Sequence, residues 1–454
     1  MRQLIINYCF VFNMKLAKQF KRPLAVVRKQ CIVSLHSSWL MLLLVVNIYG
    51  CIIIPTRVRA NGNVSSARAI GMGGAFTALA RGVEAARWNP ANLGLKENPK
   101  ISISLLSAGL SFGNSSFSSR DYNLYSGAFL EQSDIETILD KIPNHGLRID
   151  ASGELRVLSF SFRRVAVVFA GEALACGLIA KDYLDLVFNG NELRRKYSFT
   201  GTEAVSHVLS NTMISVGFPI QLSYFKEFAI GASLKYFRGF IFTSLEHVGG
   251  SFITRTNGID ADGQVIMQFA KGGSGWGTDI GIVAVSEPGV TIAIAVNNIM
   301  ASSYWSKGAK EEEAFYFGRS VTVENAEEDT LFDYDSRTIK ISTIRYYNPK
   351  VFRLGVAYEM PHWTVTADVS VEWRQYDILT PFPRLSIGTE YKRLKWLLLR
   401  GGLAFGGASK FATSIGFGIR KKKIIFDFGF INHHAMLLSL AKGTTIALAF
   451  GLVF

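Results

Sequence analysis

The sequence lacks the long apolar segments of a helical membrane protein. Its one run that approaches the 18 residues of a spanning helix is Trp39 to Ile54. Charged residues are also scarce, at 19%, whereas hydrophobic residues make up 49% and the mean hydropathy is +0.22. This balance excludes a disordered chain and is unusual for a soluble one. High hydropathy without a hydrophobic 20-mer is typical of a β-barrel in a lipid bilayer.

Acidic residues are absent from residues 1–60, which contain nine Lys or Arg. The basic cluster between Lys15 and Lys29 precedes the apolar run, and Ala60 ends a small-residue cleavage site, so the pattern predicts a signal peptide region over 1–60. Met14 is an alternative start. Removal of this region leaves 49 − 9 = 40 basic against 35 acidic residues, which lowers the formal charge from +14 to +5. The basic balance therefore gives no indication of a nucleic-acid partner.

Cysteine is nearly absent from the expected mature chain. Three of the four cysteines precede Ala60, and only Cys176 follows it. An intramolecular disulfide is therefore excluded in the mature chain.

Strict alternation of apolar and polar residues predicts membrane-spanning strands beyond residue 100. Residues 363–374 place Trp363, Val365 and Val371 on one face, and Asp368 and Glu372 on the other. One face suits hydrocarbon and the other suits water. The same pattern predicts strands over 101–112, 153–162, 165–175, 208–223, 228–240, 276–285, 290–300, 350–359, 363–374, 383–391, 396–406, 410–420, 423–431 and 443–454.

The predicted fold class is therefore all-β, a transmembrane antiparallel barrel of about 14 strands over residues 101–454. An even count allows a closed wall with no unpaired edge in lipid. Short turns are expected to alternate with longer external loops, of which the longest are 113–152, 176–207, 241–275 and 301–349. An extra hairpin within 250–270 or 314–346 would raise the count to 16. Short helices are expected in the loops, one with a capping box of Ser133 and Glu136 and one over 181–188.

Residues 61–100 lack strand alternation. The stretch from Ala67 to Ala78 contains Gly71, Gly73 and Gly74, and it is followed by the triplet Asn89, Pro90 and Ala91. Small residues let a backbone pack closely against an inner wall, so we expect this segment to fold inward as a plug.

The Gly-Met-Gly-Gly-Ala-Phe-Thr-Ala stretch, the Asn-Pro-Ala triplet and the terminal Phe454 resemble the FadL/TodX-type outer-membrane transporters of hydrophobic compounds, including their PorV-like relatives. The resemblance is sharp over 67–94 and at Phe454, and architectural elsewhere. It implies an N-terminal hatch over 61–100 and a lateral opening at a kink in the third strand, where Gly171 and Glu172 are the candidates. It also implies localisation in the cell outer membrane and a contact of Phe454 with the barrel-assembly machinery.

By this resemblance the chain passes long-chain fatty acids or other hydrophobic small molecules by passive diffusion. The alternative is a PorV-like accessory barrel that holds a secretion or surface partner. Two features depart from the family: the first two loops are also long, and residues 310–335 carry nine acidic against two basic residues. Outer-membrane lipid and lipopolysaccharide are the expected surroundings, and divalent cations bridging the acidic loop to lipopolysaccharide phosphates are a further possibility.

Charged residues on the predicted inner face admit two interpretations. The set includes Arg353, Asp368, Glu372 and Arg400. Either they form a lattice of salt bridges that braces the wall and the plug, or Arg353 or Arg400 meets a ligand carboxylate through a bidentate guanidinium. The sequence leaves both open.

Chemistry at a cofactor or metal is not expected. No G-x-S-x-G elbow appears, and no set of Ser, His and acid is specific enough to predict an enzyme. The pair His433 and His434 is adjacent on an extended segment, where side chains diverge, so it does not predict a metal site.

Overall fold

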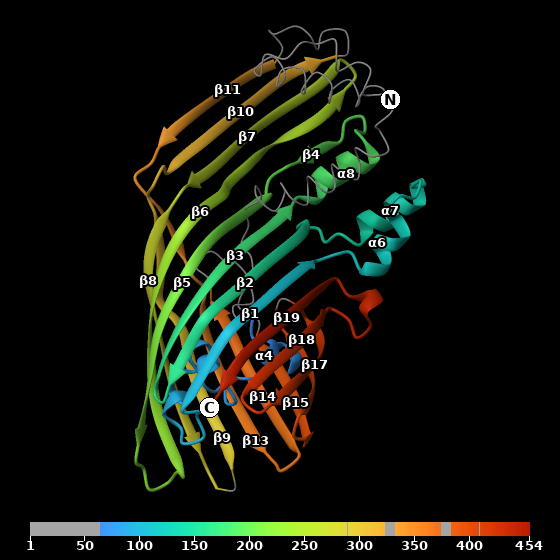
Figure 1. Ribbon diagram of the computed structural model, residues 1–454. Helices are drawn as coiled ribbons and strands as arrows, with labels where there is room; N and C mark the ends of the chain where they lie inside the picture. Colours follow the sequence, from blue (N-terminus) through green and yellow to red (C-terminus); the bar gives the residue numbers. More distant parts are fainter. Residues whose placement is uncertain (1–63, 288, 323–331, 374–382, 408) are drawn as a thin grey trace, which may run out of the picture.

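The computed structural model describes residues 64–287, 289–322, 332–373, 383–407 and 409–454 (Figure 1). The expected signal region 1–60 and Met14 lie outside the described residues. Nineteen strands form one sheet, and fourteen of them close into a ring because β1 pairs with both β2 and β19. The predicted fold class, an all-β antiparallel barrel of 14 strands, is confirmed.

The ring follows the chain order, with gaps where other strands intervene. Its members are β1 (Ile101–Asn114), β2 (Leu147–Phe162), β3 (Val165–Ile179), β5 (Glu203–Ile220), β6 (Glu227–Arg255), β8 (Gly273–Val285), β9 (Val290–Trp305), β13 (Lys350–Glu359), β14 (Trp363–Trp373), β15 (Arg384–Leu394), β16 (Leu397–Gly406), β17 (Phe411–Lys421), β18 (Ile424–His433) and β19 (Gly443–Val453).

Side-chain exposure follows the predicted alternation. On β14, Trp363 and Val365 are 45% and 41% exposed, whereas Thr364 and Thr366 are buried. The outer face is thus apolar and the inner face polar, the reverse of a soluble barrel, because hydrocarbon surrounds the outside of a membrane barrel.

Connections at the two ends of the ring differ in length. The turns 163–164, 221–226, 286–289, 360–362, 395–396 and 422–423 all lie at one end, here called the turn end. The other end, here called the loop end, carries α6 (Ser119–Tyr125), α7 (Gln132–Asp140), α8 (Lys181–Asn189) and η2 (Leu438–Leu440). The capping box of α7 is made by Glu131 and Asp134, two residues before the expected pair, because Asp134 bonds the backbone of Glu131.

Two segments expected as loops, 241–275 and 301–349, contain long strands instead. Here β6 continues for 29 residues and pairs with β7 (Gly258–Ala270), which pairs with β10 (Lys310–Val321) and then β11 (Phe332–Lys340). These strands project beyond the ring at the loop end (Figure 1) and leave its count at 14. Short strands β4 (Lys196–Ser198) and β12 (Ile344–Tyr347) pair with β6 and β9.

Residues 64–100, here called the inner segment, lie inside the ring. The segment contains α4 (Ala67–Gly71), α5 (Val83–Trp88) and η1 (Pro90–Gly94), and nearly all of its residues up to Leu95 are buried. Helix α4 contacts β16 to β19, while η1 contacts β5, β6 and β8 on the opposite side of the ring. The segment therefore reaches across the interior.

Among the described helices, none has the length and the apolar content needed to cross a membrane.

Candidate functional site

Glycines on the inner wall make room for the inner segment. A Cβ added at any of them would lie 1.9 to 2.9 Å from an atom of the inner segment. They come from nine different strands and are Gly109, Gly217, Gly231, Gly281, Gly355, Gly388, Gly402, Gly416 and Gly429. Sequence reasoning missed these glycines. Each lies at an inward position of a predicted strand, where a glycine often marks a site at which another backbone approaches closely.

The glycines that the motif singled out, Gly71, Gly73 and Gly74, lie against β15, β16 and β17. Gly73 and Gly74 adopt φ values of 68° and 86°, which favour glycine. The Ser414 hydroxyl donates to the Gly71 carbonyl at 3.1 Å, and the Arg384 guanidinium donates to the Gly73 carbonyl at 3.1 Å. These three glycines therefore hold the inner segment in its turn against the wall.

The Asn-Pro-Ala triplet forms the start of η1. The Asn89 side chain accepts from the backbone N–H of Ala91 at 3.0 Å and donates to the carbonyl of Ile282 on β8 at 3.0 Å. Pro90 occupies the first turn, where its missing N–H costs nothing. The triplet thus caps a short helix and fastens it to the wall.

Most inward arginines near α4 are paired with carboxylates. Arg68 of the inner segment contacts Glu390 at 2.8 Å, and Glu390 contacts Arg400 at 2.6 Å. Arg400 also contacts Asp427 at 2.8 Å, and Asp427 contacts Arg420 at 2.9 Å. The Arg400 side chain is fully buried in this network. At this position the structure has the salt-bridge lattice that the sequence left as one of two interpretations.

A second ionic cluster joins α5 to β2 and β3. Arg87 contacts Glu154 at 2.6 Å and Glu172 at 3.1 Å, and Arg156 contacts Glu84 at 2.7 Å. Burial by itself lowers the pKa of the Arg87 guanidinium, but attraction to the two glutamates outweighs it and raises that pKa above its usual value. Arg87 is therefore a permanent cation.

Asp368 anchors the middle of the inner segment. Its Oδ2 accepts from the backbone N–H groups of Phe76 and Thr77 at 3.0 and 2.8 Å. A carboxylate that accepts two backbone N–H groups fixes the path of the chain there.

The third strand is not broken at Gly171 and Glu172, so the kink expected at these residues is absent from the strand. Both are paired with β2 and with β5 without a register shift. The irregularity lies in the neighbouring β2, between Arg156 and Phe160, where Leu158 has a φ of 44°. Glu172 keeps the strand in place because its carboxylate also accepts from Asn211 at 3.2 Å.

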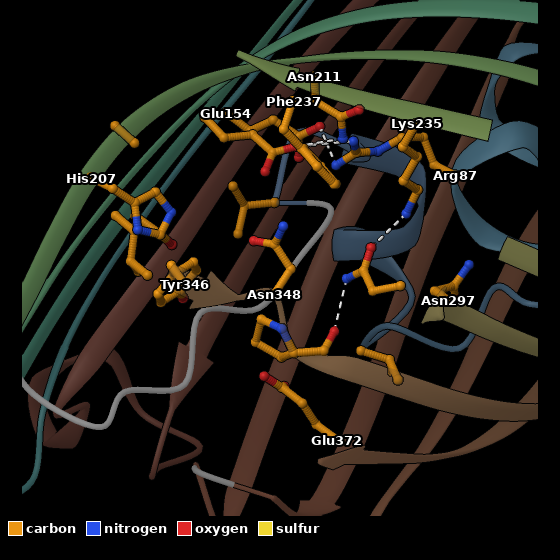
Figure 2. A pocket seen from close by; sticks show the side chains of 18 of the residues that line it. Arg87, Glu154, His207, Asn211, Lys235, Phe237, Asn297, Tyr346, Asn348 and Glu372 are labelled. Atoms are coloured by element: carbon orange, nitrogen blue, oxygen red, sulfur yellow. Dashed lines mark hydrogen bonds and ion pairs between the residues drawn. The ribbon is translucent and has the colours of Figure 1, made fainter. Parts of the chain in front are cut away.

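A cavity of about 120 Å³ lies inside the ring toward the loop end (Figure 2). We call it the loop-side cavity. Arg87, Glu154, Glu172 and Asn211 line one side, and Arg353 and Glu372 belong to its lining from β13 and β14. Figure 2 shows Asn348 between the Arg87–Glu154 pair and Glu372.

An apolar cluster borders the loop-side cavity. Its buried members include Leu209, Phe237, Phe242 and Trp305, with Tyr346 packed against them. Phe237 and Tyr346 also line the cavity. The polar loop-side cavity and the apolar cluster thus meet at Phe237 and Tyr346.

A second cavity, of about 220 Å³, lies toward the turn end and is called the turn-side cavity. Its lining includes Arg68, Arg81 and Glu84 of the inner segment, and Ser102 of β1. The inner segment lines both cavities.

Across the described residues, no group of three or more His, Cys, Asp or Glu side chains is placed to hold a metal ion. The nitrogens of His433 are engaged instead by Ser409 at 2.8 Å and by Thr445 at 2.7 Å.

Comparisons with known proteins were made by sequence and by structure. A family model described as "F plasmid transfer operon, TraF, protein" matches residues 87–369. The comparison with curated proteins finds no match.

Three solved structures are similar in fold. The Ralstonia pickettii toluene transporter TbuX is 13% identical to this chain, with a TM-score of 0.49. The P. putida toluene transporter TodX is 10% identical, with a TM-score of 0.46. A Pseudomonas aeruginosa FadL homologue is 12% identical, with a TM-score of 0.48. Each match covers 86% of this chain and 98% of the other.

Proposed function

The chain belongs to the family described as F plasmid transfer operon TraF protein, and we propose that this member is an outer-membrane channel for hydrophobic small molecules. Long-chain fatty acids are among the solutes we propose, and passage is by passive diffusion. The inner segment acts as the plug of the barrel, and residues 1–60 act as the signal peptide that is removed.

The observation that carries this proposal is the pair of cavities that the inner segment lines. The loop-side cavity adjoins the apolar rings of Phe237 and Tyr346, and Val83 and Glu84 of α5 line the turn-side cavity. A solute with an apolar body would move along the apolar cluster rather than through bulk water.

Hydrocarbon transfer supplies the physical reason for such a path. Each CH₂ removed from water contributes about 0.8 kcal/mol, so a long chain strongly prefers an apolar surface. The lipopolysaccharide leaflet is a poor solvent for hydrocarbons, and a protein path that bypasses it lowers that barrier.

The C-terminal strand supports an outer-membrane location in this proposal. Phe454 is 45% exposed at the turn end, and its backbone pairs with Ile101 at 2.9 Å, where the first and last strands meet. We assign Phe454 to recognition by the barrel-assembly machinery, because it remains accessible at the closing seam.

Mass spectrometry of molecules that co-purify with the mature protein tests the proposal first. We expect hydrophobic solutes that are absent from an unrelated barrel purified in the same way. Uptake of a labelled long-chain fatty acid into cells that lack other routes is the second measurement. Recovery of no hydrophobic molecule together with no gain in uptake would refute the function.

The projecting sheet of β6, β7, β10 and β11 favours a second candidate function, an accessory barrel that holds a partner. The described residues of β11 from Asp333 to Lys340 are exposed, and Tyr316, Phe317 and Tyr334 are 39%, 46% and 58% exposed. A photo-crosslinker at position 334 would capture a partner in the intact cell envelope. Under this candidate, we expect a specific adduct and unchanged uptake after Tyr334→Ser.

A further inference from the structure

The connection between β18 and β19 exposes a cluster of large apolar side chains. Residues 435–441, here called the rim segment, read Ala-Met-Leu-Leu-Ser-Leu-Ala and contain no charged residue. Met436, Leu437, Leu438 and Leu440 are 45% to 70% exposed. Consecutive exposed apolar residues are unfavourable in water and mark a surface that another apolar body covers.

The rim segment is fastened to the outer face of the wall. The inner-wall glycines of β17 and β18 mark the inward positions of these strands, and Thr413 and Asn432 lie at the alternate, outward positions. The Thr413 hydroxyl donates to the Ala435 carbonyl at 3.3 Å, and the Asn432 amide donates to the Met436 carbonyl at 3.5 Å. The rim segment therefore begins on the side of the ring that carries the apolar wall.

Most carbonyls of the rim segment already have donors. The Leu437 carbonyl accepts from the backbone N–H three residues further along at 3.1 Å, and the Leu438 carbonyl does the same at 3.2 Å. The Ala441 carbonyl accepts from the backbone N–H of Ser119, at the start of α6, at 3.0 Å. With the carbonyls of residues 435 and 436, five of the seven accept a hydrogen bond from the described residues. A backbone enters an apolar medium only when its polar groups are satisfied in this way.

The rim segment lies at the level at which the hydrocarbon of a membrane ends. A tilted strand crosses a bilayer with about 9–11 residues, and β18 and β19 have 10 and 11. On the opposite side of the ring, Tyr236 is the tenth residue of β6 and packs on Trp276 of β8, with 4.9 Å between the ring centroids. Exposed Tyr and Trp side chains mark the interfaces of membrane barrels. Both sides of the ring thus place this level about ten residues from the turn end.

We propose that the rim segment is an interfacial anchor, which inserts its apolar side chains among the lipid acyl chains of the leaflet at the loop end. Lipid is the occupant because the rim segment continues a surface that already faces hydrocarbon. On the strands that it joins or contacts, the outward residues Ile415, Ile446 and Leu448 are 63%, 45% and 45% exposed.

The anchor rests on the proposed outer-membrane location and is independent of the transported solute. It holds the side of the ring with short strands at a fixed depth in the bilayer, while the projecting sheet extends from β6 on the opposite side. Apolar side chains buried at the boundary between head groups and acyl chains supply this kind of attachment.

Spin labels on the mature protein in phosphatidylcholine nanodiscs test the anchor. Single cysteines are introduced in a Cys176→Ala background by Leu438→Cys in the rim segment, Ile415→Cys on the wall and Ser336→Cys on the exposed β11. Power saturation compares collisions of each label with oxygen, which enters hydrocarbon, and with a water-soluble nickel chelate. We expect the oxygen-to-chelate ratio at 438 to approach that at 415 and to exceed that at 336 at least about tenfold, because hydrocarbon strongly excludes a polar chelate.

Two matched pairs of variants test the physical basis of the contact. Leu437→Asp should lower the ratio at 438 several-fold, since a charge is expelled from the acyl chains, whereas Leu437→Met should preserve it. Thr413→Val removes the donor to the Ala435 carbonyl and should lower the ratio, whereas Thr413→Ser keeps the hydroxyl and should preserve it. A constant ratio for the label at 415 shows that each variant is folded and inserted.

A ratio at 438 equal to that at 336 would overturn the anchor. A label at 438 that neither reagent reaches would also overturn it, because a second copy or another protein would then cover the rim segment. The same conclusion would follow if Leu437→Asp left the ratio unchanged. Recovery of the mature chain in the soluble fraction of cells would remove the outer-membrane location together with the anchor. A membrane-inserted chain whose position 438 meets the chelate freely would remove the anchor alone.

Discussion

Replacement of one wall glycine should release the inner segment without opening the ring. Adjacent glycines Gly401 and Gly402 on β16 point to opposite faces. A Cβ on Gly402 would lie 2.4 Å from the Met72 carbonyl carbon and 2.5 Å from the Gly73 nitrogen. On Gly401, the nearest atom would be the Ser414 carbonyl oxygen at 3.9 Å. Gly402→Ala therefore collides with the inner segment, whereas Gly401→Ala does not.

The expected cost follows from the identity of the contacted atoms. Met72 and Gly73 present backbone, which cannot rotate away as a flexible side chain does, so the inner segment must shift. Overpacking of this kind costs about 1–3 kcal/mol. At tenfold per 1.4 kcal/mol, the inner segment should open about 5- to 140-fold more often. The hydrogen bonds of β16 with β15 and β17 run through backbone groups and should survive.

Hydrogen–deuterium exchange of the protein in nanodiscs measures this opening. We expect faster exchange across residues 69–80 in Gly402→Ala and unchanged protection of the ring strands. Gly401→Ala carries the same change of strand propensity, so it isolates the collision. Equal exchange of residues 69–80 in the two variants would refute the reasoning that the wall glycines accommodate the inner segment.

Two further predictions concern the anchors of the inner segment. Asp368→Asn keeps one oxygen but removes the charge that accepts from Phe76 and Thr77, so we expect a loss of about 1–2 kcal/mol of local stability, visible as faster exchange at those two amides. Arg400→Met removes one of the two arginines that contact each of Glu390 and Asp427, so it should cost about 1.5–3 kcal/mol in urea unfolding, the cost of lost hydrogen bonds to charged groups. An Arg400→Met protein as stable as the wild type would mean that the lattice contributes nothing to folding.

Much of the wall could be predicted from the sequence because its signal is local. On β14, the alternation of Trp363, Thr364, Val365 and Thr366 specifies which face meets hydrocarbon, whatever the rest of the chain does. The projecting strands could not be predicted in the same way. Residues 241–270 alternate less clearly and carry polar groups such as Asp260 and Asp262 on β7, which suit solvent on both faces beyond the membrane.

The partly wrong expectation at the third strand has a related cause. Glycine in a strand marks either a bend or a close contact, and the sequence gives no means to tell them apart at Gly171. The bulge occurs at Leu158 of β2, a residue type that gives no signal for it. The position of this bulge depends on the register between β2 and β3.

The sequence by itself determined the class of the protein, namely a barrel with an apolar outer face, a polar interior and a separate inner segment with a glycine-rich motif. These properties depend on residue periodicity and composition over a few neighbouring positions. Only the tertiary structure decided which inward charges are paired. Arg68 reaches Glu390 across 322 positions of the chain, and Arg353 donates to Asn297 of a different strand, because ring closure and the path of the inner segment determine which side chains meet.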